Sequence, residues 1–173
     1  LRARTEPWMT TWLASARLPA LVEDHGSPLN LHNDAPFRHH IKELNAVAAK
    51  RHVDFRVYFA RKANKCLGYV DAARDLACGV DTASPQEVEQ VLDHGLAPSR
   101  IICTAAIKES ALLDRCAQTG VVVVIDNEDE LQLLSQSANR VSRDVPIALR
   151  VSGFAYQGGK LASRFGFDMD VVA

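Results

Sequence analysis

The residue of this sequence best placed to do chemistry is Lys62, which ends an apolar stretch within residues 57–64. Alternate residues of a strand share a face, so Tyr58 and Ala60 lie on the side of Lys62, and Phe59 belongs to an apolar wall on the other side. If helices cover that wall, Lys62 points into the opposite space at the C-terminal edge, where parallel-sheet enzymes carry their sites. An amine there can form a Schiff base with a carbonyl compound. The simpler alternative is a lysine at a solvated strand end.

The elements that must position Lys62 follow a repeated pattern. Apolar strand cores recur about every 21 to 25 residues, with a helical pattern in each gap, and they centre near Val57, Val80, Ile102, Val123 and Ala148. This alternation indicates βα units and a parallel sheet.

Helix signals support this pattern. Residues 84–87 read Ser-Pro-Gln-Glu, a capping box with proline at the first helical position, and residues 127–130 open a later helix in a similar way. Residues 108–118 predict a helix between these two. Before the lysine strand, residues 37–50 predict a helix whose buried stripe is Phe37, Ile41, Leu44 and Ala48.

The N-terminal segment has a different character. Residues 8–24 have roughly helical spacing of apolar residues, but Pro19 interrupts it, so we expect two short helices. Residues 27–33 alternate apolar and polar side chains and predict a short strand.

Two folds are compatible with five βα units. A (β/α)8 barrel needs eight strands to close, and this chain supplies about five of them. An open doubly wound sheet would be complete at this length, but it usually carries a glycine-rich turn after its first strand. The sequence has neither GxGxxG nor GxxxxGK[ST], so nucleotide binding through such loops is not expected.

The composition of the chain argues against nucleic-acid, membrane and metal binding. The chain has 173 residues, 47% hydrophobic and 24% charged, with a net charge of −1, which gives no reason to expect a nucleic acid or a membrane as partner. The four cysteines lack CxxC or Cys/His spacing, so we expect free thiols and no metal site. No apolar stretch of 18 residues is present, and we expect a cytoplasmic protein.

Several motifs carry a family resemblance. Residues 58–64, Tyr-Phe-Ala-Arg-Lys-Ala-Asn, resemble the cofactor-lysine motif of the alanine racemase-like, fold type III pyridoxal-phosphate enzymes, in the branch of diaminopimelate and ornithine decarboxylases. The resemblance continues in the same order along nearly the whole chain, through residues 18–33, 79–87, 100–103 with Lys108, 148–151 and 163–167.

The resemblance implies specific roles. It implies an alanine racemase-like barrel in which Lys62 binds pyridoxal 5'-phosphate, Asp81 lies near the cofactor, and Arg150 contacts or supports the ring site. Asp81 and Arg150 can equally form structural ion pairs. Arg61 departs from the family, which commonly has an uncharged residue there, and by parity it points to the helix layer or the rim, where we expect a carboxylate partner.

The resemblance also implies the domain organisation. Residues 1–36 correspond to a helical segment and a strand leading toward the family's β-domain, and residues 37–173 to the first part of the cofactor-binding barrel. The groups that stack on the ring, grip the phosphate and face the pyridine nitrogen would lie beyond Ala173.

The activity that the resemblance implies is decarboxylation of an amino acid. Residues 63–67, Ala-Asn-Lys-Cys-Leu, run into a helix as in the decarboxylases, whereas racemases usually continue with a Tyr-Gly-His segment after the lysine. The expected partners are an amino-acid substrate and a second copy of the chain. Two alternatives stay open: a barrel protein that binds pyridoxal phosphate without turnover, and a catalytically dead relative that acts by binding another protein.

Overall fold

The computed structural model describes residues 5–161 and 163–169, and it divides into two compact units, residues 1–33 and 34–173. The first unit contains α1 (Pro7–Leu13) and α2 (Arg17–His25), so the prediction of two short helices is confirmed. The helices separate at residues 14–16 and not at Pro19. Pro19 lies in the first turn of α2, where a missing N–H leaves no helical hydrogen bond unmade.

The strand predicted for residues 27–33 is wrong, because these residues, all within the described part of the chain, form no strand. A strand needs a neighbour to pair its backbone N–H and C=O groups, and alternation of apolar and polar residues does not provide one. The segment is irregular and contains a cis peptide bond between Ser27 and Pro28.

The second unit is built on a parallel sheet with the strand order β1-β2-β3-β4-β5. All five predicted strands and the helices between them are confirmed. Their bounds are α3 (Ala35–Lys50), β1 (Tyr58–Ala60), α4 (Gly68–Asp75), β2 (Gly79–Thr82), α5 (Pro85–Asp93), the 3-10 turn η1 (Pro98–Arg100), β3 (Ile101–Cys103), α6 (Ser110–Thr119), β4 (Val122–Ile125), α7 (Glu128–Val141) and β5 (Ile147–Leu149).

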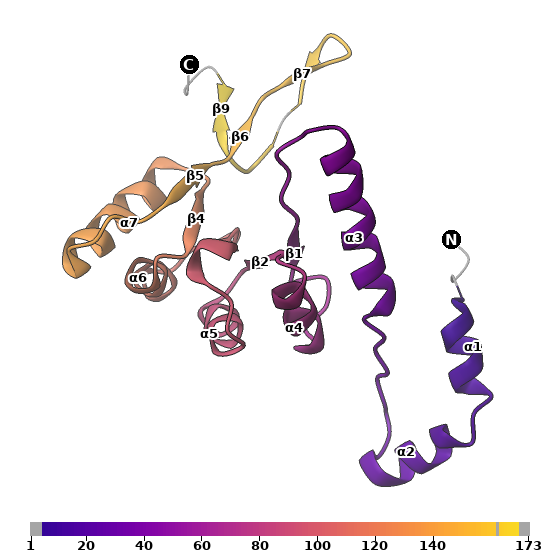
Figure 1. Ribbon diagram of the computed structural model, residues 1–173. Helices are drawn as coiled ribbons and strands as arrows, with labels where there is room; N and C mark the ends of the chain where they lie inside the picture. Colours follow the sequence, from indigo (N-terminus) through magenta and orange to yellow (C-terminus); the bar gives the residue numbers. More distant parts are fainter. Residues whose placement is uncertain (1–4, 162, 170–173) are drawn as a thin grey trace. The chain divides into compact units, whose positions relative to one another are not determined.

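The strand order decides between the two folds. Connections between parallel strands are right-handed, so strands that follow each other in chain order place all their helices on one face of the sheet. A doubly wound sheet reverses its order and carries helices on both faces. Figure 1 shows α4, α5, α6 and α7 on the same side of the sheet. The sheet therefore forms five strands of a (β/α)8 barrel, as predicted, and the doubly wound alternative is excluded.

The hydrophobic core lies between the sheet and its helices. In β2, β3 and β4, the residues that face the helices are buried, and those on the opposite face are half-buried, with the exception of the buried Gly79. Side chains at 0% exposure include Val80, Ile101, Val123 and Ile125 from the strands, with Val88, Val91, Leu113 and Cys116 from the helices. The half-buried face corresponds to the barrel interior, and it is the face on which Lys62 was predicted.

The helix starts confirm the capping signals. The Ser84 hydroxyl accepts a hydrogen bond from the Glu87 N–H at 3.2 Å, and the Glu87 carboxylate accepts one from the Ala83 N–H at 2.8 Å. The side chain of Asn127 accepts from the Glu130 N–H at 2.9 Å in the same way. These bonds satisfy backbone donors that the first turn of a helix leaves free. They fix where α5 and α7 begin beside the strand ends.

An aromatic cluster fixes β1 to the helix layer. The Phe37 ring of α3 lies 5.2 Å from the Phe59 ring and 5.5 Å from the Tyr69 ring. Ile41 is buried, as predicted, but Leu44 is 46% exposed, so its place in the buried stripe was wrong.

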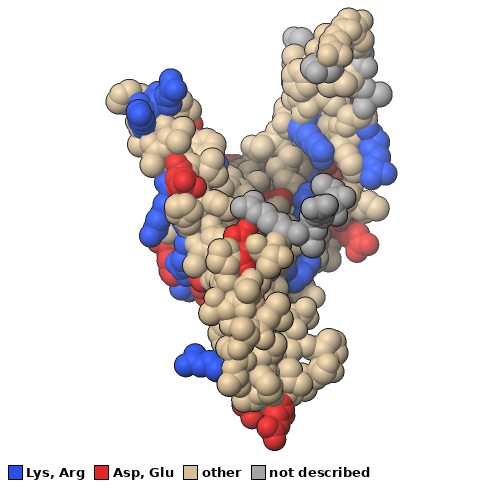
Figure 2. Space-filling view, turned by 90° about the vertical axis from the view of Figure 1, so that its right-hand side faces the viewer, with Lys and Arg blue, Asp and Glu red and all other residues tan. Residues whose placement is uncertain are grey.

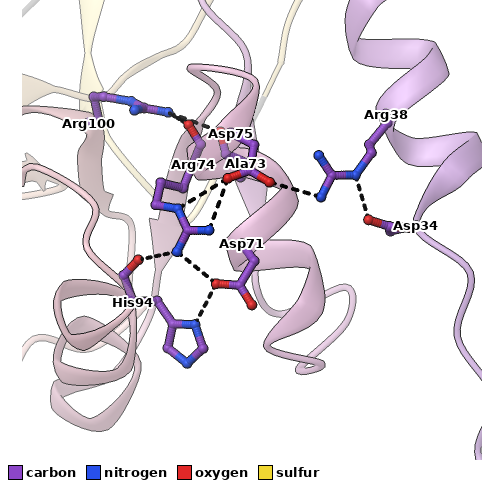
Figure 3. Close-up of polar contacts among 8 residues, drawn as sticks. All are labelled: Asp34, Arg38, Asp71, Ala73, Arg74, Asp75, His94 and Arg100. Carbon is purple, nitrogen blue, oxygen red and sulfur yellow. Dashed lines mark hydrogen bonds and ion pairs between the residues drawn. The ribbon is translucent and has the colours of Figure 1, made fainter.

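A polar network joins α3, α4 and α5 (Figure 3). Arg74 donates to Asp71 at 3.0 Å and to the His94 carbonyl at 2.9 Å, and Arg38 donates to Asp75 at 3.2 Å. Arg100 donates to the Ala73 carbonyl at 3.0 Å. Arg100 precedes β3, so this network includes the N-terminal end of that strand, opposite to the end that carries chemistry in parallel barrels. We interpret the network as structural.

The remaining strands are short. After β5, β6 (Val151–Ser152) pairs in parallel with β9 (Phe167–Asp168), and β7 (Ala155–Tyr156) forms a hairpin with β8 (Gly159–Lys160).

The surface carries charges of both signs, and Figure 2 shows Lys, Arg, Asp and Glu side chains scattered over the face in view. Among the described residues, no helix has the length and apolar character needed to cross a membrane. All four cysteines are free thiols.

Candidate functional site

Lys62 lies just after the C-terminal end of β1. Phe59 packs against the helices, so the alternation of the strand places Tyr58 and Ala60 on the inner face, as parity predicted. The Lys62 side chain is exposed. Within the described residues, it forms no hydrogen bond or ion pair, so its amine is available to another molecule.

The loop that carries Lys62 is held on both sides of this residue. The Arg61 side chain is buried at 2% exposure, and its Nη2 donates to Gln90 Oε1 at 2.9 Å and to the Lys65 carbonyl at 3.1 Å. The Lys65 ammonium forms an ion pair with Glu87. These contacts attach the loop to α5 and leave Lys62 between them as the free side chain.

Arg61 points to the helix layer, as parity predicted, but its expected carboxylate partner is wrong. It contacts an amide and a carbonyl, because Glu87 is already paired with Lys65. Burial lowers the pKa of the Arg61 guanidinium, although an arginine keeps its charge in proteins.

Asp81 lies on β2, on the inner face and beside Lys62. Its Cα pairs with that of Ala60, two residues before Lys62. The Thr104 hydroxyl donates to Asp81 Oδ1 at 2.7 Å, which fixes the direction of the carboxylate. Sequence reasoning missed Thr104, although its position two residues after Ile102, on the same face of the next strand, was a usable signal.

The inner face below Lys62 is formed by Tyr58 and Gly79, which are paired across β1 and β2. A Cβ atom at Gly79 would lie 2.3 Å from the Tyr58 ring and 2.9 Å from the Arg100 carbonyl. Only glycine therefore leaves room for the ring on the inner face. The Tyr58 ring forms part of the floor beneath the lysine.

Arg150 follows β5 at the other edge of the sheet. Its side chain is 44% exposed, and its Nη1 lies 3.5 Å from Asp126 Oδ1. The guanidinium carbon lies 4.7 Å from the centre of the Phe165 ring, a cation–π distance. The described contacts include none between Arg150 and either Lys62 or Asp81. Asp81 thus lies on the strand next to the one that Lys62 follows, and Arg150 lies apart from both at the other edge of the sheet.

Three buried charges next to Arg150 were not predicted as site residues. Asp126 directly follows β4, Glu130 lies in the first turn of α7, and Lys108 precedes α6. Their side chains are at most 9% exposed. A carboxylate directly after a strand and a second one at the third position of the next helix were signals in the sequence, but they also occur in ordinary helix caps.

This arrangement offers a free amine, an oriented carboxylate and a partly exposed guanidinium along one edge of the inner face. The amine can bond to the carbonyl carbon of an aldehyde, and the guanidinium can pair with an anionic group. These residue types fit an aldehyde-bearing, anionic cofactor, although Arg150 lies at the opposite edge of the sheet from Lys62.

Comparison with known proteins gives a consistent family. Residues 38–173 match the family model described as the pyridoxal-dependent decarboxylase, pyridoxal binding domain. The chain is 29% identical to a diaminopimelate decarboxylase of Vibrio cholerae over 143 residues, 82% of this chain and 34% of that protein. It is 33% identical to antizyme inhibitor 2 of Xenopus laevis over 128 residues, 73% of this chain and 25% of that protein.

A solved structure supports the fold. The structure of diaminopimelate decarboxylase from M. jannaschii in complex with L-lysine superposes with a TM-score of 0.74 at 20% identity, covering 88% of this chain and 38% of that one. The chain spans about a third or less of the length of the curated relatives described above.

Proposed function

This chain belongs to the family of pyridoxal-dependent decarboxylases, whose pyridoxal-binding domain it carries, and from that premise we propose that the intact protein decarboxylates an amino acid with pyridoxal 5'-phosphate held on Lys62. The observation that carries the proposal is the exposed Lys62 amine, unpaired among the described residues, just after the C-terminal end of β1 in a loop attached to α5 on both sides. When bound, the cofactor supplies an electron sink for the electron pair left at the α-carbon as carbon dioxide departs.

The residues of this chain have distinct parts in the proposal. Lys62 Nζ holds the cofactor through its aldehyde carbon. Asp81, fixed by Thr104, places a negative charge on the inner face near that bond. Arg150, just after β5, contributes a positive charge, and we assign its partly exposed guanidinium to an anionic group of the cofactor or the substrate. We further propose that the substrate site is completed by a second copy of the protein.

The cofactor assignment is tested by reducing the intact protein with borohydride in the presence of pyridoxal phosphate and mapping the peptides by mass. The pyridoxyl group should be found on Lys62, and Lys62→Ala should lose both the label and the absorbance of the bound cofactor. Lys42→Ala, which changes an exposed lysine of α3, is the matched control and should keep both. Labelling of a different lysine would refute the assignment.

The reaction is tested by measuring carbon dioxide release from a panel of amino acids, including diaminopimelate, ornithine, arginine and lysine. The match to antizyme inhibitor 2, a protein named as an inhibitor, keeps a non-catalytic function as the second candidate. Release from one amino acid supports the decarboxylase. No release despite a labelled Lys62 indicates a cofactor-binding protein, and no cofactor uptake indicates a relative that acts by binding another protein.

A further inference from the structure

A buried ion cluster lies directly behind Arg150. Lys108 Nζ is 3.1 Å from Asp126 Oδ2 and 2.9 Å from Glu130 Oε2, and the Asp126 N–H also donates to Glu130 Oε2 at 2.9 Å. The side chains of these residues are 0%, 5% and 9% exposed. The cluster thus joins the segment before α6, the residue after β4 and the first turn of α7, and it is largely shielded from water.

The charges of this cluster do not balance by themselves. Two carboxylates face one ammonium group, which leaves a net charge of −1 when all three are ionised. The Arg150 guanidinium faces the second oxygen of Asp126 at 3.5 Å and supplies the missing positive charge. Asp126 is therefore the residue through which the buried cluster acts on Arg150.

Arg150 is also held from the side opposite to Asp126. Its guanidinium lies over the Phe165 ring, and its carbonyl accepts a hydrogen bond from the Phe167 N–H at 2.7 Å. Gly166 has a φ of +83°, and a Cβ there would lie 2.7 Å from the Arg150 carbonyl oxygen. Arg150 is fixed between a buried carboxylate and an aromatic ring, with part of its side chain open.

A contribution to the stability of the fold does not by itself explain why this protein buries three charged side chains. Taking charges out of water is costly, and buried ion pairs are often replaced by apolar residues without loss of stability. Fixing the direction of one exposed guanidinium is a task that apolar residues cannot perform. We propose that Lys108, Asp126 and Glu130 are positioning residues, which act through Asp126 to hold Arg150 toward the bound cofactor.

The inference rests on the proposed function, and a double-mutant cycle tests it. In the intact protein, Asp126→Asn and Arg150→Ala should each weaken the affinity for pyridoxal phosphate about tenfold, which corresponds to about 1.4 kcal/mol. If Asp126 acts through Arg150, adding Asp126→Asn to Arg150→Ala should produce no further loss. Equal losses with and without Arg150, or no loss in Arg150→Ala, would overturn the inference.

If Asp126→Asn folds poorly, two further variants can still test whether Arg150 is held toward the cofactor. Phe165→Leu removes the ring under Arg150 and leaves the buried cluster intact, and it should weaken cofactor affinity only when Arg150 is present. Asp114→Asn breaks an exposed ion pair with Arg140 and should leave the affinity unchanged. Borohydride labelling is measured in parallel. A labelled Lys62 with additive losses rejects only the positioning role, whereas no label in the wild-type protein rejects the proposed function.

Discussion

At the scale of single residues, Gly79 is required because no side chain fits between the Tyr58 ring and the Arg100 carbonyl. Gly79→Ala introduces a Cβ at 2.3 Å from the Tyr58 ring and 2.9 Å from the Arg100 carbonyl. Since the backbone carbonyl cannot rotate away, we expect Gly79→Ala to destabilise the protein by about 1–3 kcal/mol, as overpacking of a core does. Urea unfolding at neutral pH measures this change.

Gly68→Ala is the matched control for Gly79→Ala. Gly68 begins α4, and an added Cβ would meet only the Cys66 sulfur at an ordinary 3.7 Å. Alanine is the better helix former, so this variant should be neutral or slightly more stable. Combining Gly79→Ala with Tyr58→Ala should recover part of the loss, because the second change removes the ring. Equal stability of Gly79→Ala and the wild type would contradict the proposed packing.

Individual residues also show what the sequence could and could not predict. Lys62 lies in the turn after β1, so its direction toward the inner face stays a prediction. The alternation within β1 was enough to place Tyr58 and Ala60 on the inner face and, one residue further, Arg61 toward the helices, because side-chain direction in a strand follows from parity. It could not predict that Gln90 binds Arg61 or that Thr104 orients Asp81. These partners are 29 and 23 residues away in the chain, and such contacts depend on register and side-chain conformation.

At the scale of elements, strands and helices with a strong local signal were predictable. The caps at Ser84 and Asn127 and the recurring apolar strand cores depend on neighbouring residues, and both were confirmed. The strand at residues 27–33 failed because pairing requires a distant partner. The buried cluster around Lys108 combines three separate elements, so no local pattern identified it.

The network between α3 and α4 makes stability depend on pH. Hydrogen bonds from Arg74 and then from Arg38 lower the pKa of the Asp75 carboxyl below its ordinary value of 3.8. Below that value the unfolded chain takes up protons that the folded protein does not, so the stabilising contribution of Asp75 is present above about pH 4 and is lost as the pH falls through the lowered pKa. We expect Asp75→Asn to be less stable than the wild type at pH 7, and this difference to shrink toward pH 3.

The measurement is the urea midpoint of both proteins at several pH values between 7 and 3. Asp144→Asn is the control, because Asp144 is exposed and forms no ion pair within the described part of the chain. Its difference from the wild type should stay constant over this range. A difference for Asp75→Asn that grows on acidification would show that the sign of the pKa shift is wrong.

At the scale of the whole molecule, the barrel architecture explains why Lys62 and Arg150 lie at opposite edges of the sheet. Lys62 follows β1 and Arg150 follows β5, the two edge strands of the sheet. In a closed barrel of eight strands, the first and fifth strands face each other across the interior. The two residues therefore approach the mouth of a closed barrel from opposite walls, although no contact joins them in the structure described.

This geometry predicts that the cofactor stabilises the intact protein as a whole. A ligand that binds only the folded state stabilises it by about 2.7 kcal/mol at a concentration 100 times its Kd. We expect pyridoxal phosphate to raise the thermal unfolding midpoint of the intact wild-type protein in a concentration-dependent manner, and to raise that of Lys62→Ala much less, because the covalent bond to Nζ is missing. Pyridoxamine phosphate, which lacks the aldehyde, is the control and should stabilise the two proteins alike. A larger effect of pyridoxal phosphate on Lys62→Ala than on the wild type would show that the cofactor is held elsewhere.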